Sequence, residues 1–188
     1  DLNEISGALV FTQSDIALEK LHGKILGGPV NITSVALPEG GLRIQADGDV
    51  DFDALTLDFA TTPESMLQLW GRFFNGSTAW SSTIDMVPDG VSVAVMSDLK
   101  GLGLSLPAPL AKNPTESIPF YFQKHLTKAR HELMTLRFGE VMAAQFERIR
   151  EQPYHYHPIR TTIHFGTDNQ LPTMAAGTTI KGVIPRLE

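Results

Sequence analysis

The chain has 188 residues, a formal net charge of −6 and a sequence pI of about 5.5. The acidic balance and the absence of a Lys/Arg cluster exclude a nucleic-acid partner, which would need a basic patch. The absence of cysteine excludes disulfides, zinc–thiolate sites and thiol catalysis, and it fits a reducing cytosol and a bacterial periplasm equally well.

Glycine and proline are abundant, whereas charged residues are few. The chain contains 16 Gly and 12 Pro, and only 19% of its residues are charged, which favours many short strands joined by turns. No run approaches the roughly 20 apolar residues of a membrane span, and the N-terminus has neither the basic start of a signal peptide nor an initiating Met. We therefore expect residues 1–188 to be a single β-rich module and an internal fragment of a longer protein.

Four segments of the N-terminal part alternate apolar and polar residues, as half-buried strands do. They cover residues 5–12, 16–26, 30–37 and 42–52. Turn-forming residues separate them, including Gly27-Gly28-Pro29 and Pro38-Glu39-Gly40-Gly41. Four successive strands with such short connections predict an antiparallel meander.

Thr62-Pro63-Glu64 has the features of a helix start, namely a capping hydroxyl, a proline suited to the first helical position and a nearby acid. Apolar residues then recur at three- and four-residue spacing as far as Phe74, and Asn75-Gly76 is a stop signal. This pattern predicts a short amphipathic helix near 63–74 that covers one end of the sheet. Strands are predicted to follow over residues 77–86 and 91–96.

The stretch from Ser97 to Lys112 continues the strand at 91–96 and ends in a stiff, proline-rich exit. Gly101 and Gly103 leave one face without side chains, and the leucines at 102, 104 and 106 keep the other face apolar. We interpret the two glycines as positions where a curved sheet bends. The stretch contains no nucleophile, general base or set of metal ligands.

Residues 120–150 are rich in helix-forming residues, but their alternation favours strands. Apolar residues at 134, 136 and 138 alternate with polar ones, residues 138–140 resemble a turn, and apolar residues at 142, 144 and 146 alternate on the returning strand. Residues 153–158 are predicted to form a loop. Two further strands are expected over 159–165 and 177–187.

Two groups of residues have the composition of metal sites without the spacing. The carboxylates of Asp47, Asp49, Asp51 and Asp53 alternate as calcium ligands do, but Phe52 stands where an EF-hand loop needs glycine, and a strand would place all four on one solvated face. His155 and His157, with His164, lack an acidic or sulfur partner at a diagnostic spacing. We predict no metal site.

No catalytic residue or cofactor site is predicted either. There is no Gly-x-Ser-x-Gly elbow, no assignable Ser–His–Asp set, and no glycine-rich loop that opens a helix for a phosphate. Carboxylate pairs of the kind used in glycoside hydrolysis stay open at this point, because their separation is a three-dimensional property.

Several segments, in their order and spacing, resemble the YhdP family of AsmA-like bacterial envelope proteins. These segments are Gly23–Val30, Gly76–Trp80, Ser97–Leu102, Leu106–Lys112 and residues 177–187. The resemblance implies a periplasmic part of a longer protein that is anchored in the inner membrane of a Gram-negative cell through segments outside this chain. It also implies a long, curved sheet with an apolar concave face, a role in phospholipid transport between the two membranes, and no catalytic residues.

Pattern and resemblance together predict a mainly β fold: a curved, mostly antiparallel, trough-like sheet with one short amphipathic helix near 63–74. Its expected partners are phospholipid and the adjoining segments of the full-length protein. The side chains expected to contact lipid are Leu9, Phe11, Ile32, Ile44, Met134, Leu136, Phe138, Phe146, Ile163 and Phe165. In the alternative, these side chains pack against the helix and one another, and the module is a structural spacer or protein-interaction module without lipid binding.

Overall fold

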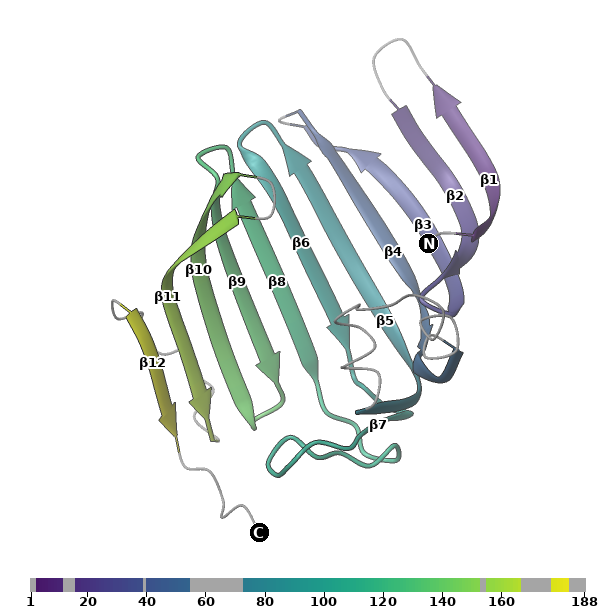
Figure 1. Ribbon diagram of the computed structural model, residues 1–188. Coiled ribbons are helices and arrows are strands. Elements are labelled where there is room, and N and C mark those ends of the chain that lie inside the picture. The colour runs from purple at the N-terminus through teal and green to yellow at the C-terminus, as the bar shows by residue number, and fades with distance from the viewer. Residues whose placement is uncertain are drawn as a thin grey trace.

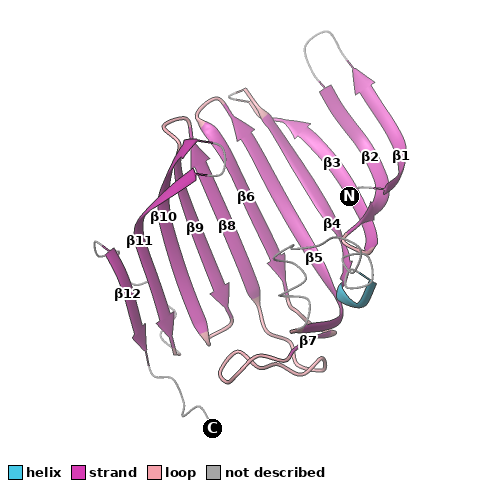
Figure 2. Ribbon diagram, viewed as in Figure 1, coloured by secondary structure: helices cyan, strands magenta, loops and turns pink. Residues whose placement is uncertain are grey.

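The computed structural model describes residues 3–11, 16–38, 40–54, 73–152, 155–166 and 177–182. These residues form one curved sheet of twelve strands, shown in Figure 1. The strands are β1 (Asn3–Phe11), β2 (Ile16–Ile25), β3 (Gly28–Ala36), β4 (Leu42–Asp51), β5 (Phe74–Val87), β6 (Gly90–Ser97), β7 (Leu102–Leu104), β8 (Phe120–Thr127), β9 (His131–Phe138), β10 (Met142–Gln152), β11 (His155–Phe165) and β12 (Gly177–Gly182). Figure 2 shows that strands dominate, with a helical turn at residues 52–54.

Strands that follow one another in the chain also lie side by side in the sheet. The order is β1-β2-β3-β4-β5-β6-β8-β9-β10-β11-β12, and β7 pairs with β5 outside this path. All of these pairs are antiparallel except β11 and β12, which are parallel. The prediction of a mainly β, mostly antiparallel and curved sheet is therefore confirmed.

The register of the strands places apolar side chains on one face. Residues directly opposite each other in paired strands point to the same side of a sheet. One such row crosses nine strands and consists of Ile32, Ala46, Ser82, Val95, Phe122, Leu136, Ala144, Ile163 and Ile180. The residues between them along each strand, such as Arg43, Gln45 and Asp47 in β4, face the other way and are largely polar.

Residues 120–150 form strands β8, β9 and β10, as their alternation predicts and their helix propensity does not. The turn expected at residues 138–140 joins β9 to β10, where Val141 N donates to Phe138 O at 3.0 Å. Alternation prevails over propensity because β8, β9 and β10 each pair with strands on both edges, which satisfies their backbone hydrogen bonds and brings cross-strand side chains into contact. In this segment the alternation of apolar and polar residues is therefore a better guide to the structure than helix propensity.

Other expected boundaries need correction. The loop predicted at residues 153–158 is wrong for residues 155–158, which belong to β11. Asp53 lies in the helical turn, so the strand with alternating carboxylates ends at Asp51. The predicted helix near 63–74 lies mostly outside the described residues, but its expected end is wrong, because Phe73 lies in a turn and Phe74 begins β5.

The stretch after β6 does not bend the main sheet, contrary to our interpretation of its glycines. The chain leaves the sheet after Ser97, and β7 pairs with the first residues of β5 through Gly76 and Leu102. Gly76 and Gly101 have φ angles of 83° and 93°, in the left-handed region that favours glycine. A Cβ on Gly101 would lie 2.3 Å from Ser77 O, so these glycines allow two backbone segments to approach closely.

We expect Gly101→Ala to lower the free energy of unfolding more than Gly40→Ala does. Gly40 has a similar φ of 81°, but no atom lies within 4 Å of the position that a Cβ would take there, so alanine at position 40 brings backbone strain of about 1–2 kcal/mol alone. At position 101 the steric overlap adds about 1–3 kcal/mol. Urea denaturation of the two variants measures the difference, and equal losses would show that the approach of β7 to β5 is not constrained.

Candidate functional site

The apolar side of the sheet is the candidate site, and we call it the trough face. Its members are Val30, Ile32, Ile44, Val50, Trp80, Ile84, Val93, Val95, Phe120, Phe122, Met134, Leu136, Phe138, Met142, Ala144, Phe146, Ile163 and Phe165. Most of them keep part of their surface exposed, including all those of β6 and β8. Only Val30, Val50, Phe138 and Ala144 of this set are buried. Within the described residues, the trough face is therefore incompletely covered.

One end of the trough face is closed by the segment that contains β7, at the lower end of the sheet in Figure 1. We call this segment, residues 98–119 between β6 and β8, the closing segment. Leu99, Leu102, Leu104 and Phe138 form a buried apolar cluster there. The rings of Phe52 and Phe74 stack beside it, with their centroids 4.9 Å apart. This cluster is the main concentration of buried apolar side chains among the described residues.

Lys112 holds the closing segment in place. Its side chain is buried, and Nζ donates hydrogen bonds to Leu102 O at 2.7 Å and to Asn113 O at 3.0 Å. Burial lowers the pKa of Lys112, although the charges of Glu116 and Asp98 oppose that shift. The backbone of Lys112 also exchanges hydrogen bonds with Leu104, so one residue holds both the first and the last residue of β7.

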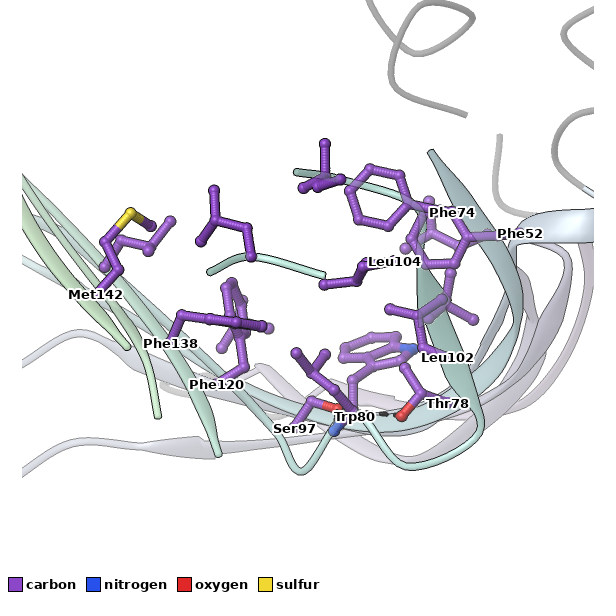
Figure 3. A pocket seen from close by; sticks show the side chains of 17 residues that line it. Phe52, Phe74, Thr78, Trp80, Ser97, Leu102, Leu104, Phe120, Phe138 and Met142 are labelled. Carbon is purple, nitrogen blue, oxygen red and sulfur yellow. Dashed lines mark hydrogen bonds between the residues drawn. The ribbon is translucent and has the colours of Figure 1, made fainter. Parts of the chain in front are cut away.

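A cavity of about 560 Å³ lies between this segment and the trough face. Figure 3 shows Phe52 and Phe74 on one side, Phe138 and Met142 on the other, and Trp80 on the floor. Its lining consists of Leu26, Val50, Phe52, Phe74, Thr78, Trp80, Val95, Ser97, Leu99, Leu102, Leu104, Leu106, Leu110, Phe120, Leu136, Phe138 and Met142. A volume of several hundred Å³ with apolar walls is typical of small-molecule sites.

The few polar groups of the cavity are mostly paired with one another. The hydroxyls of Thr78 and Ser97 are 3.3 Å apart, and Ser97 Oγ donates to Ala79 O at 2.6 Å. Trp80 Nε1 is buried and has no hydrogen-bond partner among the described residues. The cavity therefore presents an apolar surface, and no charged side chain belongs to its lining.

A cluster of charges lies on the same face, toward the opposite end of the strands. Lys124 Nζ lies 2.7 Å from Glu132 Oε1, and Arg148 Nε donates to Glu132 Oε2. The guanidinium of Arg148 also lies over the ring of Tyr156, 3.7 Å from its centroid. We call Lys124, Glu132 and Arg148 the charged triad.

Glu132 is ionised in this setting. Burial raises the pKa of Glu132, but hydrogen bonds from Lys124 and Arg148 and their positive charges together lower it below the ordinary value. The Glu132 side chain is 1% exposed, whereas those of Lys124 and Arg148 are 33% and 29% exposed. The carboxylate is thus covered, and the two cations keep exposed surface.

The structure brings together most of the side chains expected to contact lipid. Ile32, Ile44, Met134, Leu136, Phe138, Phe146, Ile163 and Phe165 all lie on the trough face. Leu136 and Phe138 line the cavity, and the others lie outside its lining. The side chains of Leu9 and Phe11 are outside the described part of the structure.

Sequence reasoning missed much of the cavity and all of the charged triad. Trp80, Val95 and Phe120 lie at the alternating apolar positions of their strands, so the period-two pattern of the sequence was a signal that they face the apolar side. Phe52 and Leu110 come from a helical turn and a loop, which carry no such period. The triad joins residues from three strands, and only the register shows that they meet.

The residues considered for metal binding do not form a cluster. Within the described ranges, no group of three or more His, Asp or Glu side chains could hold a metal ion. Asp51 Oδ1 accepts hydrogen bonds from the backbone N–H groups of residues 53 and 54, and Asp47 Oδ2 accepts a hydrogen bond from the side-chain amide Nδ2 of Asn31 at 3.0 Å. His157 Nε2 lies 3.1 Å from Glu151 Oε2.

The described residues form a curved, single-layer β-sheet with an apolar inner face and a cavity at one end of that face. The family model of the YhdP protein matches residues 1–188, so the chain belongs to the YhdP family of envelope proteins. No curated protein and no solved structure matched the chain. In the described part of the chain, no helix is both long and apolar enough to cross a membrane.

We expect acid to lower the free energy of unfolding of the wild type more than that of the Glu132→Gln variant. The lowered pKa means that ionised Glu132 stabilises the fold fully above its unfolded pKa of about 4.3, and that this contribution disappears as pH falls through the lower folded pKa. At neutral pH the variant should be less stable by about 2 kcal/mol. The difference in the free energy of unfolding between the two proteins, measured by urea denaturation, should stay constant down to about pH 5 and narrow as the pH falls further.

Glu140→Gln is the matched control, because Glu140 is exposed in the turn between β9 and β10. The pKa of Asp85 is also lowered, by its hydrogen bonds with Arg43, so the wild type and the control should share that part of the acid response. Parallel curves for wild type and Glu132→Gln would contradict a stabilising role for the ionised carboxylate.

Proposed function

We propose that this chain is a non-enzymatic module for phospholipid transport, and that its trough face binds acyl chains. Family membership supports a place in the cell envelope. We further propose that the module works in the periplasm, between the inner and outer membranes. It would then be held by adjoining segments of a longer, membrane-anchored protein.

The observation that carries this proposal is an extended apolar face that the described residues cover only in part. The row from Ile32 to Ile180 crosses nine strands, and its large aliphatic and aromatic members remain partly exposed. Exposed apolar patches of this extent mark binding surfaces. Transfer of each methylene of an acyl chain from water to such a surface contributes about 0.8 kcal/mol.

The cavity lies at one end of this surface, where the methyl end of an acyl chain can be buried from several sides. Its lining combines aromatic side chains with leucines from the closing segment. Methyl and methylene groups need no directional partner, so such a cavity accepts chains of varied structure. The mixed aromatic and aliphatic lining therefore suits acyl chains better than a polar ligand.

The experiment measures whether the chain takes phospholipid from vesicles of brominated phosphatidylethanolamine and phosphatidylglycerol. Trp70 and Trp80 are the two tryptophans, so Trp70→Phe leaves Trp80 on the cavity floor as the sole reporter. Bromine quenches indole fluorescence on contact. We expect quenching of Trp80, and phospholipid detected by mass spectrometry in protein separated from the vesicles.

Leu136→Asp should weaken capture by at least about tenfold, because a carboxylate on the apolar path must be desolvated by the incoming chain. Leu133→Asp is the matched control, since Leu133 lies in the same strand, 38% exposed, and pairs with His125 on the opposite face. Equal capture by both variants, or no capture by the wild type, would refute lipid binding. It would favour a structural spacer that pairs through its edge strands.

A further inference from the structure

We propose that the charged triad binds the phosphate group of an anionic phospholipid, with the acyl chain lying along the trough face toward the cavity. This inference rests on the proposed function and adds a headgroup site to it. The triad consists of Lys124 in β8, Glu132 in β9 and Arg148 in β10. It has no part in the closure of the cavity.

The position of the triad is the first argument. Leu126, Glu132 and Arg148 occupy one row across β8, β9 and β10, and Lys124 lies in the adjacent row between Val93 and Met134. The charges therefore share the face that carries the acyl-binding side chains. An amphiphile lying on this face would meet its apolar and its charged region at the same time.

The charge balance is the second argument. Two cations and one carboxylate give the triad a formal net charge of +1, in a chain whose net charge is −6. The buried carboxylate lies between the cations, and they retain exposed surface. Lys124 has three N–H donors and Arg148 five, so each keeps donors beyond its contact with Glu132. A phosphodiester oxygen is the acceptor that such donors favour.

The orientation of Arg148 supports the same ligand. Its Nε is engaged by Glu132 and its guanidinium plane lies on the ring of Tyr156, 3.7 Å from the centroid. An irregularity in the pairing of β10 and β11 at Glu147 and Arg148 accompanies this arrangement, and the upper ends of these two strands turn sideways, across β9 and β8 in the view of Figure 1. The guanidinium is thus fixed before a ligand arrives, which reduces the entropy lost on binding.

The distance from the triad to the cavity is the third argument. Glu132 and Phe138 are six residues apart in β9, so at about 3.4 Å per residue they are separated by about 20 Å along the strand. An acyl chain of one leaflet covers about 15 Å, half the hydrocarbon thickness of a bilayer. A lipid whose phosphate meets the triad therefore places its chain end near Leu136 and Phe138, where the cavity begins.

Stability alone does not account for the triad. A buried ion pair is often no more stabilising than apolar residues of similar volume. The rows beside it show that apolar residues such as Met134 and Phe146 fit this face. Apolar residues would therefore serve stability as well at this place, whereas the exposed surface of the two cations offers an anionic ligand a contact that apolar residues lack.

The test compares two amphiphiles with the same chain, palmitoyl lysophosphatidylglycerol and monopalmitoylglycerol, which lacks the phosphate. Their Kd values are measured with the full chain carrying Trp70→Phe, from Trp80 fluorescence. We expect the phosphate to tighten binding by about tenfold. Lys124→Gln and Arg148→Gln should remove this preference, so that each variant binds the two amphiphiles with similar Kd values.

Lys128→Gln is the matched control, because Lys128 is exposed in the turn after β8 and loses the same charge. Lys124→Arg should keep the preference. If Lys124→Gln fails to fold, Glu132→Gln replaces it; this change raises the charge of the triad to +2 and should tighten binding of the phosphate probe.

Each outcome decides between the two proposals. Equal Kd values for both amphiphiles, or a preference that survives Lys124→Gln and Arg148→Gln, would overturn the headgroup site and leave acyl binding intact. Failure of monopalmitoylglycerol to bind would overturn acyl binding itself. Displacement of the phosphate probe by a few millimolar inorganic phosphate, to the same extent as by phospholipid, would show a simple anion site and overturn the lipid assignment.

Discussion

The register of the antiparallel pairs is the constraint on which the rest of the structure depends. In-register pairing from β2 to β11 keeps apolar side chains together in rows such as the one through Val95 and Leu136. A slip of one residue in any pair would turn that strand's apolar side outward. Continuous register therefore produces one long apolar face rather than several separate cores.

A single-layer sheet cannot bury that face by itself. Ordinary β domains pack a second sheet or a helix on the apolar side. Here the described residues supply such cover at one end, through Leu102, Leu104 and the buried Lys112. The remainder of the trough face is left partly exposed, and an acyl chain of the right length would complete its packing.

The charged side chains on the two faces of the sheet differ in how they are paired. On the outer face, Arg43 and Asp85 form a paired contact between neighbouring strands that needs no ligand. On the trough face, the charged triad carries an excess positive charge among apolar rows. This difference makes the inner face suited to a molecule with one anionic and one apolar part.

By itself, the sequence determined the class of the fold and the face of most apolar side chains. Alternation is a local property, so the strands at residues 120–150 and the common face of Ile44, Leu136 and Ile163 followed from it. The cavity and the triad were decided by tertiary structure. Leu102 reaches the cavity because the chain leaves the sheet at Ser97, and Glu132 meets two cations because three strands align in register; neither contact has a sequence period.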